Sequence, residues 1–273
     1  MENIKNRIII FILIAFVGLI ACGKMPTKVM TYDNAKKQNF TITKLDYQDL
    51  PYTRNYTSSL KTDKDEDSSG VPLFLYHNKF YYHPVQIAQR SIELIDGYWH
   101  SNNKAYLKKA ELLADKLIQI ADTYDSILYF PYHFDFHLHG LPNQLMIAPW
   151  YSGMAQGQAL SVFSRLYMFT KNQSYLDYAT KLFKSFFRFK GEKTPWVVYI
   201  DPLGYYWIEE YPMETPCNTL NGYLFAIFGI YDYYLVTNDA LSKDILLASL
   251  TTIKHYLPYL SKCKRYQLLL LKT

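Results

Sequence analysis

Helical periodicity constrains this chain more than any other feature of its sequence. Six segments beyond residue 70 carry apolar residues at spacings of three and four, the pattern of amphipathic helices. The segments are residues 83–100, 104–124, 152–170, 174–189, 219–237 and 241–257. They come in pairs, because the joints at 100–103, 170–173 and 237–239 are short and rich in residues that cap helix N-termini.

Three antiparallel helical hairpins are therefore expected to follow one another. We predict a mainly α fold in which paired antiparallel helices form an (α/α) toroid-like domain, whole or partial, with short β-hairpin insertions. The first helix of each pair would face an axis, where small residues such as Gly157, Gly222 and Gly229 permit close approach. An irregular helical bundle is the alternative.

The N-terminus has the pattern of an export signal. Lys5 and Arg7 precede a short apolar run, residues 8–22, that ends at Cys22. The stretch Leu19–Cys22 resembles the bacterial lipobox, in which the cysteine is acylated and becomes the mature N-terminus. We therefore expect a lipoprotein signal peptide over 1–21, a polar tether over 22–69 and the helical domain over 70–273. The protein would be anchored to a membrane of the cell envelope through Cys22.

Composition narrows the classes of partner. Removing residues 1–21 takes away Lys5, Arg7 and Glu2, so the net charge of +5 becomes +4, too weak and dispersed to indicate nucleic acid. The 27 tyrosines fit a carbohydrate-binding cleft, because tyrosine offers a sugar both an apolar face and a hydroxyl. An AT-rich genome would give the same surplus. Cys217 and Cys263 have no spacing signature, and we expect them to be unpaired.

Two insertions between the helical pairs are expected to carry function, at residues 128–150 and 193–212. In the first, His133, Asp135, His137 and His139 alternate, so on a strand they share one face. A polar rim or sugar contacts are favoured there over a metal site. In the second, residues 197–200 followed by Pro-Leu-Gly predict a short hairpin.

The helix at 152–170 carries two glutamines, Gln156 and Gln158, on an otherwise small and apolar surface. Being two residues apart, they cannot share one helical face. We expect one of them to reach the cleft, with Gln156 as the substrate-binding candidate together with Tyr132. Buried amides that bond to neighbouring backbone are the alternative.

Three motifs resemble one family. Residues 70–89 ("GVPLFLYHNKFYYHPVQIAQ"), 148–179 and 205–234 ("YYWIEEYPMETPCNTLNGYLFAIFGIYDYY") are similar, in the same order, to the C-terminal domain of D-glucuronyl C5-epimerases. These enzymes convert glucuronate to iduronate within heparan-type polysaccharides. The resemblance implies proton transfer by Tyr211 beside Glu210, a substrate contact at Asn221, and sugar-flanking roles for Tyr81 and Tyr82. His83 stands where the family usually has tyrosine.

The implied reaction sets requirements on the site. C5 of a uronate lies next to a carboxylate, so proton removal requires cations or strong donors at that carboxylate as an enediolate forms. A tyrosine near pKa 10 suits proton transfer if the site lowers that pKa. Glu210 would relay a proton or orient the hydroxyl. No cofactor or metal is required, and a uronate-containing polysaccharide is the expected partner; a homodimer is also possible.

The chain departs from the family pattern after residue 260. The family continues with a helical stretch that carries an arginine and a second tyrosine, whereas this chain reads "SKCKRYQLLLLKT", in which Tyr266 has a different context. Impaired activity is expected on this ground. Two alternatives to an epimerase follow: a uronate polysaccharide lyase, which shares C5 proton abstraction, and a non-catalytic glycan-binding lipoprotein.

Overall fold

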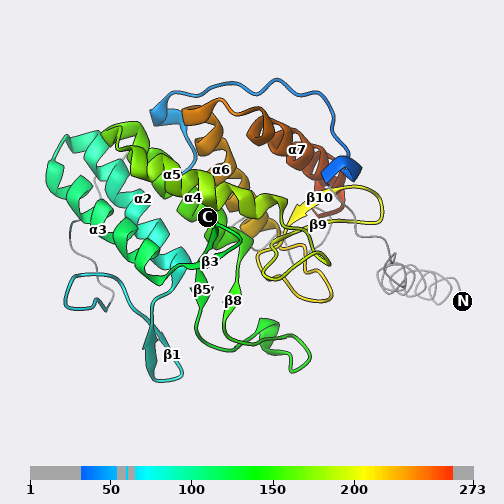
Figure 1. Cartoon of the computed structure of the whole chain (residues 1–273), viewed down its shortest axis with the longest axis horizontal. Coiled ribbons are helices and arrows are strands. Elements are labelled where there is room, and N and C mark those ends of the chain that lie inside the picture. The colour runs from blue at the N-terminus through cyan, green and yellow to red at the C-terminus, as the bar shows by residue number, and fades with distance from the viewer. Residues whose placement is uncertain (1–31, 54–59, 61–64, 261–273) are drawn as a thin grey trace, which may run out of the picture.

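A computed structural model describes residues 32–53, 60 and 65–260 of the chain (Figure 1). The predicted signal peptide, Cys22 and the residues that follow Leu260 lie outside these ranges. Among the described residues, no helix is both long enough and apolar enough to cross a membrane.

Within the described ranges, six α-helices confirm the predicted pairs. They are α2 (Pro84–Ser101), α3 (Lys104–Ile120), α4 (Gly153–Thr170), α5 (Gln173–Phe183), α6 (Leu220–Thr237) and α7 (Ala240–Leu260). The expected caps are present at the short joints. Asn103 and Asn172 accept the backbone N–H of Ala105 and Ser174 at 3.0 and 3.1 Å.

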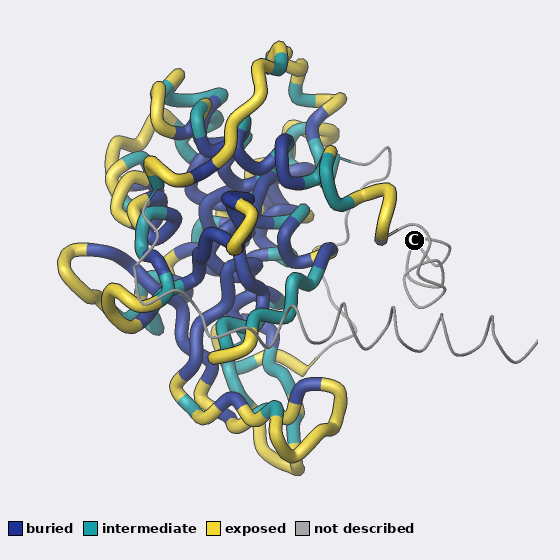
Figure 2. The backbone as a smooth tube through the Cα atoms, turned by 90° about the vertical axis from the view of Figure 1, so that its right-hand side faces the viewer, coloured by how far each residue is buried: buried dark blue, intermediate teal, exposed yellow. Residues whose placement is uncertain are grey.

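The helices form two rows. The first helices pack side by side, with α4 between α2 and α6, and each second helix packs against its own first helix (Figure 1). The mainly α class with paired antiparallel helices is thus confirmed, and the described part of the chain forms an arc of three helical hairpins. Figure 2 shows the buried backbone at the centre of this arrangement and the exposed backbone at the loops.

The strands are short and pair only two at a time. The antiparallel pairs are β1 (Phe74–Tyr76) with β2 (Lys79–Tyr81), β3 (Asp122–Tyr124) with β4 (Ile127–Tyr129), β5 (Pro131–Tyr132) with β8 (Trp150–Tyr151), β6 (Phe136–His137) with β7 (Leu145–Met146), and β9 (Val198–Ile200) with β10 (Tyr206–Ile208). The hairpin predicted at 197–200 is confirmed as β9–β10. Two helices end earlier than predicted: residues 122–124 pair with β4 instead, and residues 184–187 form a 3-10 turn.

The helices α4 and α6 lie unusually close to one another. A Cβ on Gly229 would lie 2.6 Å from the carbonyl carbon of Gly157, so neither helix has room for a side chain there. A buried ion pair joins the same two helices: Arg165 Nε donates to Asp232 Oδ2 at 2.7 Å, and both side chains are fully buried. The α4–α6 contact is therefore fixed by both sterics and charge.

The segment that precedes the helices contacts them closely. Among residues 32–53, the Gln38 N–H donates to Thr251 Oγ1 at 2.8 Å, and the Leu45 N–H donates to the Tyr231 hydroxyl at 2.9 Å. Arg165 also donates to the Pro51 carbonyl. The sequence predicted a polar tether over 22–69 and gave no sign of these contacts. A polar composition does not show which backbone groups will form hydrogen bonds to a helix surface.

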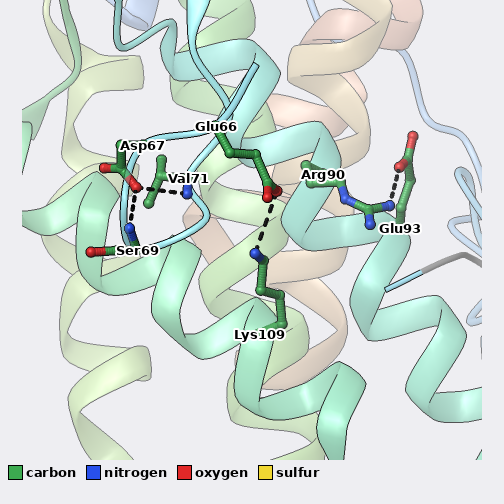
Figure 3. Close-up of polar contacts among 7 residues, drawn as sticks. All are labelled: Glu66, Asp67, Ser69, Val71, Arg90, Glu93 and Lys109. Carbon is green, nitrogen blue, oxygen red and sulfur yellow. Dashed lines mark hydrogen bonds and ion pairs between the residues drawn. The ribbon is translucent and has the colours of Figure 1, made fainter. Parts of the chain in front are cut away.

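A loop just before β1 is held by carboxylates (Figure 3). Asp67 Oδ1 accepts the N–H groups of Ser69 and Val71 at 2.9 and 3.0 Å, and Lys109 of α3 lies 3.4 Å from Glu66. These bonds fix the start of the β1–β2 hairpin against the first helical pair.

Replacing Gly229 with alanine tests the close packing of α4 and α6. Helix propensity alone would make the variant more stable by ~1 kcal/mol. The added Cβ has no room, so we expect Gly229→Ala to lose about 1–3 kcal/mol of unfolding free energy in denaturant titrations. A stabilised variant would show that the two backbones are not in contact.

Candidate active site

One cavity of about 180 Å³ lies below the first row of helices, where the insertions and the β1–β2 hairpin meet. Its lining combines many aromatic rings with one carboxyl group. The lining residues are Phe74, Tyr76, His83, Val85, Tyr132, Phe134, Phe136, Trp150, Ser152, Met154, Glu210 and Tyr211. Three of the residues singled out from the sequence, Tyr132, Glu210 and Tyr211, are thus brought together.

Stacked rings form one wall of the cavity. Tyr132 and Trp150 stack with ring centroids 3.9 Å apart and planes 8° from parallel, and the Trp150 indole N–H donates to the Phe134 carbonyl at 2.9 Å. Phe136 stacks on Tyr211 at 5.8 Å. Flat apolar faces of this kind suit the C–H surface of a sugar ring.

The alternation predicted in the first insertion is present, but its polar face points away from the cavity. Phe134 is buried in the lining, whereas His133, Asp135 and His137 are exposed. No group of three or more His, Cys, Asp or Glu side chains in the described ranges is placed to hold a metal ion. The apolar residues between the polar ones are therefore the ones that build the site.

Glu210 and Tyr211 enter the cavity directly after β10. The Glu210 side chain lies against the start of α6, where a Cβ on Gly222 would come within 2.5 Å of Glu210 Cβ. Glu210 Oε2 is buried and has no hydrogen-bond partner among the described residues. Burial raises the pKa of Glu210, and the Tyr211 hydroxyl and Gly222 N–H offset this only in part.

The pKa of Tyr211 is shifted in the direction opposite to the one expected. Burial raises it well above its ordinary value, and the neighbouring Glu210 carboxyl raises it further. No lysine or arginine occurs among the described lining residues to lower it. Tyr211 therefore keeps its proton at neutral pH, and it is a weaker acid than a solvent-exposed tyrosine.

Glu209 is fully buried. The sequence alone did not distinguish it from a solvent-exposed glutamate. Its carboxyl oxygens accept the N–H groups of Cys217 and Asn218 at 2.8 and 3.0 Å, which shapes the loop from Tyr211 to α6. Burial raises its pKa to about 7, against the opposing effect of those two bonds and of Lys190. Cys217 in this loop is a free thiol, as expected.

Other predicted substrate-binding residues lie outside the cavity lining. Gln156 is fully buried and bonds to the Phe130 N–H and the Leu128 carbonyl, so its amide joins the first insertion to α4. The Tyr82 hydroxyl donates to Asp67 at 2.8 Å, on the far side of its hairpin. Tyr81 packs on Phe134, and Asn221 is exposed at the start of α6. Contacts of Tyr81 and Asn221 with a substrate stay predictions.

His83 borders the cavity. From the sequence we noted only that it stands where the family usually has tyrosine. It is the N-cap of α2, and its Nδ1 accepts the Gln86 N–H at 3.2 Å. Its ring lies 4.8 Å from that of Phe74 and 4.9 Å from that of Tyr132.

The raised pKa of Glu209 predicts how stability depends on pH. The folded value of about 7 exceeds the ordinary 4.5, so between these values the folded protein binds more protons than the unfolded chain. Unfolding free energy should therefore fall as pH rises from 5 to 8, by roughly 3 kcal/mol at most. Glu209→Gln removes this titration, so denaturant titrations should show wild type losing stability relative to the variant over that range. Curves that run parallel would contradict the assignment.

Comparisons with known proteins show the family to which the matched residues belong. A family model described as D-glucuronyl C5-epimerase C-terminus matches residues 124–266, just over half of the chain. A D-glucuronyl C5-epimerase of Caenorhabditis elegans is 36% identical over 90 residues, which are 33% of this chain and 14% of that protein. The chain thus matches only a small part of that relative's length.

Two solved structures are similar to this chain at low sequence identity. A family 76 glycoside hydrolase (mannosidase) from Bacteroides thetaiotaomicron is 17% identical with a TM-score of 0.46, over 73% of this chain and 49% of the other. Cellobiose 2-epimerase from Bacillus thermoamylovorans is 16% identical with a TM-score of 0.44, over 69% of this chain and 49% of the other.

The residues that the family model matches include Glu210, Tyr211 and the two first helices α4 and α6, which pack against each other. The resemblance found in the motifs at 148–179 and 205–234 is therefore confirmed. The chain belongs to the family of D-glucuronyl C5-epimerase C-terminal domains.

Proposed function

We propose that this domain epimerises a uronate residue at C5 within a polysaccharide, converting D-glucuronate to L-iduronate. The observation that carries the proposal is the pairing of Tyr211 with Glu210 in an aromatic cavity, within the sequence shared with the family. The cavity offers stacking faces for one sugar ring and opens to solvent.

The proton chemistry starts from the placement of the pair, with the Tyr211 hydroxyl beside the Glu210 carboxyl in the cavity. A base on the opposite face of the sugar takes the C5 proton and leaves the enediolate, a role assigned to no described lining residue. Tyr211 then delivers its hydroxyl proton to C5 on its own face of the sugar. The O–H bond of Tyr211 breaks as the new C5–H bond forms. Glu210, beside the hydroxyl, relays a proton from solvent to the phenolate oxygen, which restores the Tyr211 hydroxyl.

Burial supports this division of roles. Glu210 is 7% exposed and sits against the N-terminal turn of α6, whose backbone N–H groups favour a carboxylate. The helix end thus limits the cost of the negative charge that appears when Glu210 gives up its proton. A tyrosinate without this partner would leave an uncompensated charge in an aromatic cavity.

Tyr211→Phe tests the role of the hydroxyl. The ring and its stacking on Phe136 remain, so polymer binding should persist while solvent deuterium incorporation at C5 falls ~10²- to 10⁴-fold. Tyr167→Phe, at the far end of α4, is the matched control and should keep wild-type exchange. Full exchange in Tyr211→Phe would remove this residue from the reaction.

The same incubation separates the alternative functions. Deuterium at C5 of wild-type product without chain cleavage supports an epimerase. An unsaturated uronate that absorbs in the ultraviolet would instead indicate a lyase, because loss of the C4 substituent then replaces reprotonation. Binding of the polymer without exchange in wild type would indicate a glycan-binding protein.

We also propose that Cys22 carries a lipid that holds the domain at the cell envelope. The lipobox pattern supports this, and a surface location suits an enzyme that acts on an exported polysaccharide. Cys22→Ser should move the protein from the membrane fraction to the soluble fraction, whereas Cys217→Ser should leave it in the membrane fraction. Unchanged membrane association of Cys22→Ser would contradict the proposal.

A further inference from the structure

The β1–β2 hairpin, which projects below the helices in Figure 1, presents one of its two faces to the cavity. Its strands pair in register, with Phe74 opposite Tyr81 and Tyr76 opposite Lys79. Side chains alternate between the faces of a strand, so these four residues share one face of the hairpin. Phe74 and Tyr76 line the cavity. Lys79 and Tyr81 therefore lie on the cavity side of the hairpin, although neither belongs to the lining.

This arrangement brings a cation to the rim of an aromatic cavity. The Lys79 ammonium lies over the Tyr81 ring, with Nζ 5.2 Å from the ring centroid. The Tyr81 ring packs against Phe134 of the lining at 5.2 Å, and the Tyr76 ring packs against the same residue at 4.9 Å. Aromatic rings thus continue from the lining to the surface that carries the lysine.

The charge of Lys79 is not neutralised within the described ranges. Its side chain is exposed, and no ion pair joins it to a described aspartate or glutamate. Five other lysines each pair with a carboxylate: Lys37, Lys109, Lys116, Lys190 and Lys193. The described lining contains no lysine or arginine. The hairpin therefore offers an anionic ligand the cation that the lining lacks.

We propose that Lys79 binds the carboxylate of a second uronate residue of the same polymer, outside the cavity. The identity of the polymer rests on the proposed function, but binding at this subsite does not require turnover. Tyr76 and Tyr81 offer ring faces beside the charge, so an acidic sugar meets both an apolar surface and a cation. Lys79 lies outside the lining and has no part in stabilising the enediolate.

Binding is measured with tetrasaccharides that alternate uronate and glucosamine. One carries two glucuronates, and two others each have glucose in place of one of them. Wild type should bind the first about 3- to 10-fold more tightly than either of the others. The ratio should fall as salt concentration rises, because exposed charges are screened. Replacing that glucose with its 6-sulfate shows whether a sulfate ester takes the place of the carboxylate.

Lys79→Met removes the charge and keeps the length of the side chain, so it should lose most of this preference. Lys79→Arg should keep it. Lys171 also lies over a tyrosine, with Nζ 5.5 Å from the Tyr167 ring, at the end of α4 opposite to the cavity. Lys171→Met is therefore the matched control and should bind as wild type does. Lys79 is exposed, so the melting temperature of Lys79→Met should stay near that of wild type.

Turnover gives a second readout. In C5 deuterium exchange with the polymer, Lys79→Met should raise KM about 3- to 10-fold and leave kcat unchanged, because Lys79 binds a residue that does not react. A fall in kcat at unchanged KM would place Lys79 at the reacting residue and overturn the proposal.

The outcomes separate this subsite from the proposed function. If wild type exchanges C5 deuterium and Lys79→Met keeps both its KM and its preference for two uronates, the subsite fails while the epimerase stands. If wild type shows no exchange but its preference depends on Lys79, the epimerase fails and the subsite stands. Equal affinity of wild type for the tetrasaccharides with one and two uronates, or tight binding restored only by the sulfate, overturns the assignment of Lys79 to a uronate.

Discussion

The close approach of α4 and α6 is the constraint on which the site depends. Gly157 and Gly229 allow the two backbones to touch, and the buried Arg165–Asp232 pair holds them in register. Breaking such a pair on one side would leave a charge without a partner in the core, so the pairing strongly disfavours any slip of one helix along the other. The N-terminal ends of both helices are thereby brought to the same side of the molecule.

That shared side is where the acidic pair enters. The Gly153 N–H of α4 donates to the Glu209 carbonyl at 2.8 Å, and Gly222 of α6 leaves the space that Glu210 fills. One helix thus fixes the backbone between the two glutamates, and the other accommodates the second side chain. Glu209 then turns inward to bind the following loop, so the acidic pair divides into a structural carboxyl group and a cavity carboxyl group.

The low polarity of the cavity explains the direction of its pKa shifts. Glu210, Tyr211 and Tyr132 interact with one another among rings, and burial is the first cause of the raised pKa in each case.

Helical pairing could be predicted from the sequence because it depends on local spacing and on caps such as Asn103 and Asn172. The motif Glu210-Tyr211 also led to the cavity. The burial of Glu209 could not be predicted, because it depends on a loop folding back to give two N–H groups to its carboxyl. The sequence could not show whether Gln156 contacts a substrate or bonds to backbone, for a similar reason. The partner of a buried amide lies on a distant segment, here the backbone at residues 128–130.

The first insertion alternates polar and aromatic residues, and this alternation contained the information about the aromatic wall. From the sequence we gave the functional role to the polar face, whereas the aromatic face lines the cavity. The alternation of polar and aromatic residues there is equally compatible with either face pointing inward. The stacking of Tyr132 on Trp150 decides it, and that contact joins strands separated by the whole insertion.

The most direct measurement is a crystal structure of the protein with a short glucuronate oligosaccharide. We predict a uronate ring stacked along the Tyr132–Trp150 wall, with C5 roughly 3–3.5 Å from the Tyr211 hydroxyl. A uronate bound outside this cavity, or bound in it with C5 turned away from Tyr211, would contradict the account.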